Sequence, residues 1–385
     1  MKIDKIEIIR VAIPFDSGRK NTESDQQDYN AASSSVSQME TLLVAVYTDN
    51  GLCGWGEAFG HLINPVTFAT LESTVAPFFL GKDFSSSSDI EKLMKQAEYA
   101  FHAFGRTGPV RYALSSIDIA LWDLIGKEAD LPLWKLLGGK RDRIGIYPSL
   151  VSYDNDPIAV TQQVSFVSSL GFSEIKLHET TREAVEAARN VLRQEDAKLM
   201  VDVNCPWSSE EAYSHAKNWS DLNLAWLEEP VWPPEDVDAL AYVRTAGIPL
   251  AAGENAAGDG DFRHLITSGC IDIVQPSVVK VGGITAMLRV FELANQYPIR
   301  VVPHCFYYGA GMMAAAHLVS LLPESVKLEV PWVKWGEQLH TFLNFMPEMA
   351  LPETPGLGFV PDKEVLQKFQ IATAICSFEE EESYV

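Results

Sequence analysis

The chain has 385 residues, of which 47% are hydrophobic and 21% are charged, and its formal net charge at pH 7 is −22. This composition is that of a globular protein long enough for one barrel and a smaller second domain. The negative charge argues against nucleic acid as a partner, since phosphate binding needs a basic surface. No stretch reaches the roughly 18 apolar residues of a membrane span, so we expect no membrane insertion.

The cysteines and the first residues indicate a reducing compartment. The five cysteines are odd in number, scattered, and form no CxxC pair. The N-terminal segment alternates like a strand and lacks the long apolar core of a signal peptide. We therefore expect a cytoplasmic protein without disulfides.

The N-terminal third of the chain predicts a mixed domain of strands and helices. Two predicted strands, residues 4–14 and 41–49, flank an insert at 16–38 that is rich in Ser, Asn, Asp and Gln. This insert is either a surface loop or a mobile lid that closes over substrate. A third strand with a glycine-rich turn follows, and then three helical patterns, at residues 52–60, 66–80, 88–104 and 108–127.

From about residue 145 the pattern changes to a repeated strand, loop and helix. Eight alternating units of this kind predict a parallel barrel with right-handed crossovers. We expect three parts: a capping domain at 1–127, a barrel at 140–330, and a C-terminal segment, 331–385, that returns to the cap. The predicted strands end near Ser149, Lys176, Val203, Glu228, Gly253, Gln275, Pro303 and Glu329.

Four charged residues follow one another at a constant step of 26 residues. They are Lys176, Asp202, Glu228 and Glu254, and each closes a short apolar run. The step is about one strand, one helix and two loops, which is the repeat of a βα-barrel. Parallel strands deliver their last residues to the same mouth, so these side chains should meet. Three carboxylates suit Mg²⁺, and we predict a Mg²⁺ site on Asp202, Glu228 and Glu254.

Further predicted strand ends supply acid–base groups. His178 lies two residues after Lys176, so both side chains should point to the interior mouth. His304 closes the seventh strand and Glu329 the eighth. An imidazole titrates near neutrality and suits proton transfer, and Glu329 is expected to bind an oxygen of the substrate or intermediate.

These motifs together resemble the enolase superfamily, mandelate racemase/muconate lactonizing enzyme family. The resemblance covers nearly the whole chain. It implies an α/β fold, a modified TIM barrel (β/α)₇β with an N-terminal α+β capping domain, and Mg²⁺-dependent removal of the proton next to a carboxylate. It also implies specificity loops at 16–38 and 59–64. The motifs are ALSSIDIALWDLIGKEADLPLWKLLGG, KLH at 176–178, DVN at 202–204, LEEP at 227–230, GEN at 253–255, QPSVVKVGG at 275–283, and PH at 303–304.

Two residues depart from the family pattern. His178 stands where the family usually has the second lysine of Lys-x-Lys. Ser277 stands where the family has an aspartate that pairs with the histidine of strand seven. A carboxylate partner raises the basicity of a histidine and fixes its tautomer, whereas a serine adds no charge. We therefore expect His304 to be a weaker base than usual and better suited to act as an acid.

These departures favour dehydration. Racemisation needs a competent base on each face of the substrate, whereas dehydration needs one base and one acid. The main hypothesis is a Mg²⁺-dependent dehydratase that converts a sugar acid to a 2-keto-3-deoxy acid, with His178 or His304 as the base. The alternatives are a cycloisomerase of a sugar-acid lactone or anhydro sugar acid, a racemase or epimerase, and a metal-dependent sugar-acid binding protein without turnover.

Further residues are expected at the rim of the site. Asn204, Ser277, His61 and Tyr147 are candidates for substrate binding. Lys280 either holds a metal-ligand carboxylate or is a rim charge. The expected partner is a small carboxylate, and the family resemblance implies a homo-oligomer, from a dimer to an octamer.

Overall fold

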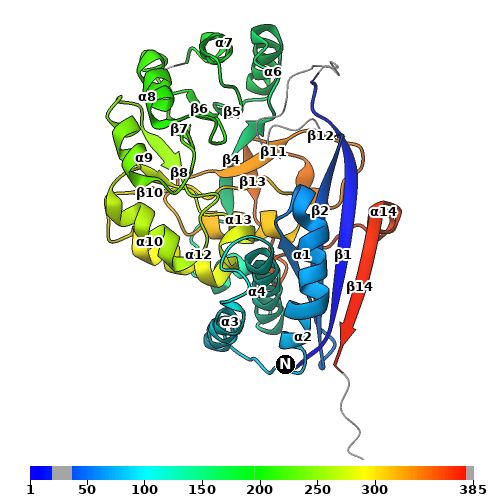
Figure 1. Ribbon diagram of the computed structural model, residues 1–385. Helices are drawn as coiled ribbons and strands as arrows, with labels where there is room; N and C mark the ends of the chain where they lie inside the picture. Colours follow the sequence, from blue (N-terminus) through cyan, green and yellow to red (C-terminus); the bar gives the residue numbers. More distant parts are fainter. Residues whose placement is uncertain (20–36, 195, 379–385) are drawn as a thin grey trace, which may run out of the picture.

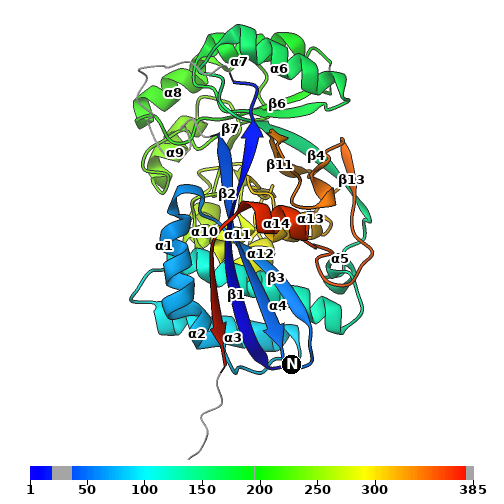
Figure 2. The same cartoon turned by 90° about the vertical axis from the view of Figure 1, so that its right-hand side faces the viewer.

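The structure is a computed structural model that describes residues 1–19, 37–194 and 196–378 (Figure 1). The predicted lid at 16–38 lies mostly outside the described residues, and so does the acidic run at 379–382. In both views the barrel helices α6–α8 lie at one end of the molecule, and α2 and α3 lie at the other end beside the N-terminus (Figures 1 and 2).

The cap is an antiparallel sheet covered by helices. The long strand β1 pairs with β2 on one side and with β14 and β12 on the other, and β2 pairs with β3. The strands are β1 (Ile3–Asp16), β2 (Gln38–Thr48), β3 (Cys53–Ala58), β12 (Lys334–Trp335) and β14 (Gln370–Ser377). The helices are η2 (His61–Ile63), α1 (Asn64–Thr70), η3 (Leu71–Val75), α2 (Ala76–Phe79), α3 (Ser87–Phe101), α4 (Pro109–Glu128) and α5 (Leu133–Leu136).

Close packing between β3 and α4 explains the glycines of the segment LCGWGEAFG. A Cβ atom added at Gly56 would lie 1.8 Å from the carbonyl oxygen of Ser116, and one added at Gly54 would lie 2.3 Å from that of Ala120. Only glycine lets the strand approach the helix so closely. The same segment contains Glu57 and leads into His61.

The barrel contains eight parallel strands in the order β10-β9-β8-β7-β6-β5-β4-β11. Seven of them are followed by helices, which gives the predicted (β/α)₇β arrangement. The strands are β4 (Arg143–Leu150), β5 (Glu174–Leu177), β6 (Lys198–Asp202), β7 (Trp226–Glu228), β8 (Leu250–Ala252), β9 (Ile273–Val274), β10 (Arg300–Val301) and β11 (Leu328–Trp332). The helices are α6 (Pro157–Ser169), α7 (Arg182–Val191), α8 (Ser209–Asn218), α9 (Val237–Arg244), α10 (Gly258–Ser268), α11 (Val278–Val281), α12 (Gly283–Ala294) and α13 (Ala310–Val319).

The C-terminal segment joins the two parts. It contributes β12 and β14 to the cap and a short strand to the barrel, which pairs with β4. Its remaining elements are η4 (Thr341–Leu343), β13 (Glu348–Ala350) and α14 (Lys363–Phe369).

The barrel interior is layered, and the layer beneath the strand ends is apolar. Tyr147, Met200, Trp226 and Ile273 form a small buried cluster with neighbouring side chains. Each lies two residues before the inward residue that closes its strand. Tyr147 is 1% exposed and its ring packs edge-on against Trp226. The expectation that Tyr147 forms a wall of the substrate pocket is therefore corrected: the pleat of β4 places it in the barrel floor.

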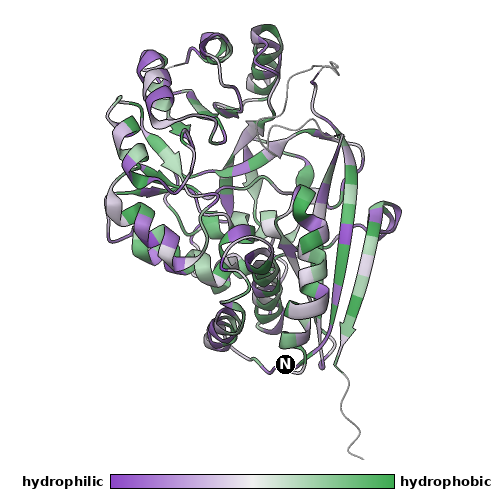
Figure 3. Cartoon of the chain, viewed as in Figure 1, coloured by the Kyte–Doolittle hydropathy of each residue, from purple (hydrophilic) through white to green (hydrophobic). Residues whose placement is uncertain are grey.

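Hydropathy follows the packing. The outer helices α3 and α7 are largely hydrophilic, whereas β1 is mostly hydrophobic (Figure 3). Among the described residues, no helix combines the length and the apolar composition that a membrane crossing requires.

A buried histidine ties three segments of the fold together. His317 of α13 accepts a hydrogen bond at Nδ1 from the backbone N–H of Trp134, at 3.0 Å. Its Nε2 lies 3.0 Å from the carbonyl oxygen of Leu357, which only accepts, so Nε2 carries the proton. Burial lowers the pKa of His317 to about 4. The neutral ring thus joins the barrel to α5 and to the C-terminal segment.

Because of His317, we expect the stability of the fold to decrease in acid. Its folded pKa lies below the ordinary value of 6.5, so the stability that it contributes above pH 6.5 is lost as the pH falls towards 4. We expect the stability difference between the parent and His317→Gln to fall by about 3 kcal/mol between pH 7 and 4. Urea unfolding at several pH values measures it, and a difference that does not change with pH would contradict the assignment.

Candidate active site

The strand ends of the barrel bring the four spaced residues into one buried cluster. Lys176 lies on β5, Asp202 ends β6, Glu228 ends β7, and Glu254 follows β8. All four are at most 9% exposed. One oxygen from each of the three carboxylates lies within 4.8 Å of the others. The parallel register places Asp202 directly opposite Glu228, which is why a fixed sequence step becomes a spatial cluster.

The donor set fits Mg²⁺. Three carboxylate oxygens gathered within 4.8 Å of one another suit a hard cation that binds oxygen ligands at about 2.1 Å. The second oxygen of Glu228 is already occupied, because the side chains of Trp226 and Gln275 each donate to it at 2.8 Å. The backbone N–H of Asn204 donates to Asp202 Oδ1 at 2.9 Å. These bonds hold one oxygen of each of these two carboxylates and orient the other.

Lys176 balances the negative charge from the barrel side. Its Nζ lies 2.7 Å from Glu228 and from Glu329, and 3.3 Å from Asp202. Burial opposes the charge on Lys176, but Glu228, Glu329 and Asp202 together raise its pKa well above the ordinary value. Burial raises the pKa of Asp202, yet Lys176 and His178 outweigh burial and lower it to about 2. Lys176 is therefore a fixed positive charge.

Lys280 balances the opposite side of the cluster. Its Nζ contacts Glu254 Oε1 at 2.9 Å and Asn255 Oδ1 at 3.2 Å. It is 3% exposed and lies over the ring of Phe59, 4.1 Å from the centroid. Burial alone would raise the pKa of Glu254, but His304 and Lys280 bring it well below the ordinary value. Of the two roles expected for Lys280, the contact favours that of holding a ligand carboxylate.

The two histidines lie at different edges of the cluster. His178 Nε2 is 3.2 Å from Asp202, and its Nδ1 faces the carbonyl oxygen of Leu150. His304 Nε2 is 3.0 Å from Glu254. Burial lowers the pKa of His178, but the hydrogen bond and charge of Asp202 raise it overall.

The histidines differ in what holds their second nitrogen. The Leu150 carbonyl fixes the Nδ1 proton of His178, whereas the buried Nδ1 of His304 has no hydrogen-bond partner among the described residues. Ser277 is fully buried and pairs with His304 through the backbone. The serine is thus close to the histidine without orienting its ring.

Of the rim residues predicted from the sequence, His61 and Asn204 lie at the site, whereas Tyr147 does not. His61 reaches the site: its ring packs edge-on against Phe59 and lies near Phe306, and burial followed by the charge of Lys280 lowers its pKa to about 4. Asn204 lies beside Asp202 in a left-handed backbone conformation, with φ of 52°. Tyr147 lies beneath the site, as described above.

Several site residues were not anticipated. Glu229 is buried, and it accepts hydrogen bonds from Asn255 at 2.6 Å and from Cys205 Sγ at 3.3 Å. Burial and then Glu254 raise its pKa to about 8. The ring of Phe306 lies 5.9 Å from that of His178. The second glutamate of LEEP was the only sequence signal for any of these.

Buried polar atoms without a protein partner lie in the barrel interior around the carboxylates. They come from strands or strand ends other than those of the three carboxylates. Among the described residues they include Ser149 Oγ, Gln275 Oε1 and His304 Nδ1. A buried polar atom without a partner is costly, so this part of the interior is suited to bind water or a hydroxylated ligand.

The chain matches known proteins over most of its length. Residues 20–138 match the N-terminal domain of mandelate racemase / muconate lactonizing enzyme, and residues 159–365 match the family described as enolase C-terminal domain-like. The chain is 30% identical to the D-xylonate dehydratase of Haloferax volcanii over 359 residues, covering 86% of this chain and 85% of that protein.

Two solved structures are similar over the whole fold. The 3,6-anhydro-D-galactonate cycloisomerase from Zobellia galactanivorans has a TM-score of 0.81 at 27% identity, covering 97% of this chain and 100% of that one. A mandelate racemase/muconate lactonizing protein from Paracoccus denitrificans PD1222, complexed with magnesium, has a TM-score of 0.81 at 28% identity, covering 96% and 98%.

The carboxylate cluster predicts that Mg²⁺ stabilises the fold. A ligand that binds only the folded state raises its stability. We expect Mg²⁺ to raise the melting temperature of the parent relative to EDTA, and Glu254→Gln to lose most of this increase because a ligand charge is missing. Glu174→Gln is the matched control, since Glu174 lies at the opposite end of β5 and pairs with Lys198. An undiminished Mg²⁺ effect in Glu254→Gln would place the metal elsewhere.

Substitution of Lys176 should lower the stability of the fold, and by more in EDTA than in Mg²⁺. Truncating one partner of a buried ion cluster costs about 3–5 kcal/mol. We expect Lys176→Met to lose stability of this order in EDTA and to recover part of it in Mg²⁺, which also neutralises the carboxylates. Urea unfolding with and without Mg²⁺ measures the effect. Lys198→Met, at the far end of the barrel, is the control, and equal losses in the two variants would refute the prediction.

Proposed function

Because the chain belongs to the mandelate racemase/muconate lactonizing enzyme family of the enolase superfamily, we propose that it is a Mg²⁺-dependent dehydratase of a sugar acid. The enzyme removes the proton next to a carboxylate, and the hydroxyl group on the adjacent carbon then leaves as water. The asymmetry between His178 and His304 is the observation that carries this proposal, because dehydration needs one base and one acid.

His178 is assigned as the base. A carbonyl oxygen only accepts, so the contact with Leu150 keeps the proton of the neutral ring on Nδ1. The contact of Nε2 with Asp202 needs a proton in the ligand-free site, so His178 acts as a base once that proton has left; the lone pair is then on Nε2, on the side of the carboxylate cluster. This nitrogen takes the α-proton of the substrate. Lys176, which stays charged, offsets the negative charge that develops on the substrate carboxylate.

His304 is assigned as the acid. Its Nε2 faces Glu254 and needs a proton for that contact, and its buried Nδ1 has no hydrogen-bond partner among the described residues. It gives the Nε2 proton to the β-hydroxyl group, which leaves as water, and the resulting enol becomes a 2-keto-3-deoxy acid. Bound Mg²⁺ would supply Lewis-acid stabilisation of the enediolate charge, held by Asp202, Glu228 and Glu254.

The substrate is proposed to be a hydroxylated carboxylate. The unpartnered polar atoms of Ser149 and Gln275 in the barrel interior support this assignment. The similarity to the D-xylonate dehydratase of Haloferax volcanii supports a sugar acid. Glu329, which contacts Lys176 and accepts the backbone N–H of Cys305, is proposed to bind an oxygen of the intermediate.

A cycloisomerase is the second candidate. The similarity to the 3,6-anhydro-D-galactonate cycloisomerase extends over all of that chain. The same two histidines would then expel a ring oxygen instead of water. Mass spectrometry separates the two reactions, because the product of dehydration is lighter by one water and that of cycloisomerisation is not.

The assembly and location of the enzyme belong to the same proposal. We propose a cytoplasmic homo-oligomer. The cysteines of the described chain are all free, which supports a reducing compartment. Light scattering of the purified protein would test the assembly.

The test of the proposed function separates proton removal from loss of water. Purified enzyme with Mg²⁺ is screened against sugar acids and their lactones in D₂O, and keto acid formation and α-deuterium exchange are measured together. We expect His304→Asn to lose about 10²–10⁴-fold in keto acid formation but to keep exchange, and His178→Asn to lose both.

The control for this test is His264→Asn, on the exposed face of α10. It should behave like the parent. Epimers without keto acid would support a racemase instead. Loss of exchange in His304→Asn with retention in His178→Asn would reverse the two assignments.

A further inference from the structure

A cap residue outside the predicted site holds the loop that carries His304. Glu57 lies at the end of β3, the strand that packs on α4, and it is 1% exposed. Its Oε2 accepts hydrogen bonds from the backbone N–H groups of Gly309 at 2.9 Å and Gly311 at 2.8 Å. Its Oε1 accepts from the hydroxyl of Thr41 at 2.5 Å.

These bonds lie at the N-terminus of a barrel helix. Gly309 is the N-cap of α13 and offers no side chain to cap it. The first N–H groups of a helix have no partner within the helix, and a negative charge there interacts favourably with the helix dipole. Bonds between a carboxylate and backbone N–H groups are among the stronger hydrogen bonds. Glu57 therefore supplies from the cap the capping group that α13 lacks.

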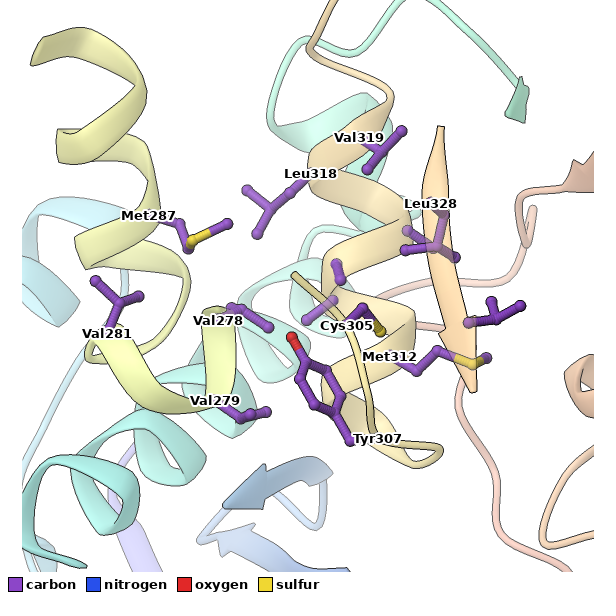
Figure 4. Close-up of a cluster of buried hydrophobic side chains, with 14 of the residues drawn as sticks. Val278, Val279, Val281, Met287, Cys305, Tyr307, Met312, Leu318, Val319 and Leu328 are labelled. Atoms are coloured by element: carbon purple, nitrogen blue, oxygen red, sulfur yellow. The ribbon is translucent and has the colours of Figure 1, made fainter. Parts of the chain in front are cut away.

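The glycines form a cradle around this carboxylate. A Cβ atom at Gly309 would lie 2.8 Å from Glu57 Oε2, and one at Gly311 would lie 3.0 Å from the same oxygen and 2.3 Å from Val279 Cγ1. Side chains at these positions would displace the carboxylate. Figure 4 shows Val279, Cys305, Tyr307 and Met312 among the side chains of one buried hydrophobic cluster.

The short loop between His304 and Gly309 is held at several points. The hydroxyl of Tyr307 donates to the carbonyl oxygen of His304 at 3.0 Å, and the backbone N–H of Cys305 donates to Glu329 at 3.0 Å. The hydroxyl of Tyr308 donates to the carbonyl oxygen of Met39 in the cap, at 2.8 Å. The cap thus holds the far end of the loop through two contacts, the hydroxyl of Tyr308 on Met39 and the carboxyl group of Glu57.

We propose that Glu57 is a positioning residue for His304, so that proton delivery to the leaving group depends on a carboxylate of the cap. The proposal rests on the proposed function in one respect, the assignment of His304 as the acid. Among the described residues, His304 has no partner on Nδ1 that orients its ring. Apart from the contact of Nε2 with Glu254, its position therefore depends on the backbone of the loop, and Glu57 fixes that backbone where it enters α13.

The test compares Glu57→Ala with Glu57→Gln. The amide introduced by Glu57→Gln keeps an oxygen for the two N–H groups and a nitrogen that can donate to Thr41, so it should preserve the loop. We expect Glu57→Ala to lower kcat for keto acid formation about 10²-fold, the cost of a displacement of about 1 Å, with KM and α-deuterium exchange within about threefold of the parent. Glu57→Gln should recover most of kcat.

The matched control is Asp123→Ala. Asp123 is also a fully buried carboxylate of the cap, and it accepts the backbone N–H groups of Trp55 at 2.8 Å and Leu357 at 2.7 Å. Its hydrogen bonds within the described residues go to segments other than the His304 loop. We expect Asp123→Ala to lower stability without changing the ratio of exchange to keto acid formation.

Amide hydrogen exchange of the peptides that cover residues 304–311 provides a readout without substrate. It should be faster in Glu57→Ala than in the parent or in Asp123→Ala. If the amides of the loop exchange faster in Glu57→Ala but neither the parent nor any variant forms keto acid, the proposed function is wrong, whereas the contact between Glu57 and the loop is confirmed. Unchanged loop exchange, or equal losses of α-deuterium exchange and keto acid in Glu57→Ala, would overturn the positioning role.

Discussion

Mutual repulsion of buried carboxylates is the constraint on which the rest of the site depends. Asp202, Glu228 and Glu254 lie within 4.8 Å of one another, and Glu329 lies next to them across Lys176. Burial strengthens this repulsion, so each carboxylate is held by several donors. Lys176 and Lys280 approach the cluster from two sides, and both histidines face it. An arrangement with this much buried negative charge is suited to a divalent cation.

The cap contributes to the site through the barrel helices as well as through its loops. Glu57 binds the N-terminus of α13, which follows the strand that leads to His304. In the same way Asp118 of α4 accepts the backbone N–H of Thr285 at 3.0 Å, near the start of α12, which follows the short helix α11 that carries Lys280. Burial raises the pKa of Asp118 to about 7. Two fully buried carboxylates of the cap therefore hold the starts of two barrel helices that follow site residues.

The carboxylate cluster could be predicted from the sequence because of the topology. In a parallel barrel the carboxyl ends of all strands lie on one side, so a constant step along the chain becomes a ring of neighbours. The eight strands end within three residues of their predicted ends for the same reason. The family signatures added the expectation of a cap and of magnesium, which the comparisons support.

Residues whose role depends on three-dimensional packing could not be predicted in this way. Tyr147 has the right residue type and strand, but the pleat directs it into the barrel floor. Glu57 binds groups that lie about 250 residues away in the sequence, and no local pattern indicates such a contact. The difference between the two histidines depends on which atom lies beside each Nδ1. The sequence indicates through Ser277 that no carboxylate lies beside Nδ1 of His304, but no residue type indicates that the carbonyl oxygen of Leu150 lies beside Nδ1 of His178.

The central claim is that His178 and His304 act on two different atoms of one substrate. The most direct measurement is a crystal structure of the enzyme with Mg²⁺ and a slowly reacting sugar-acid analogue. We predict His178 Nε2 beside the α-carbon and His304 Nε2 within about 3 Å of the β-oxygen. Two histidines on opposite faces of the α-carbon, with the β-oxygen in contact with neither, would contradict this claim and indicate a racemase.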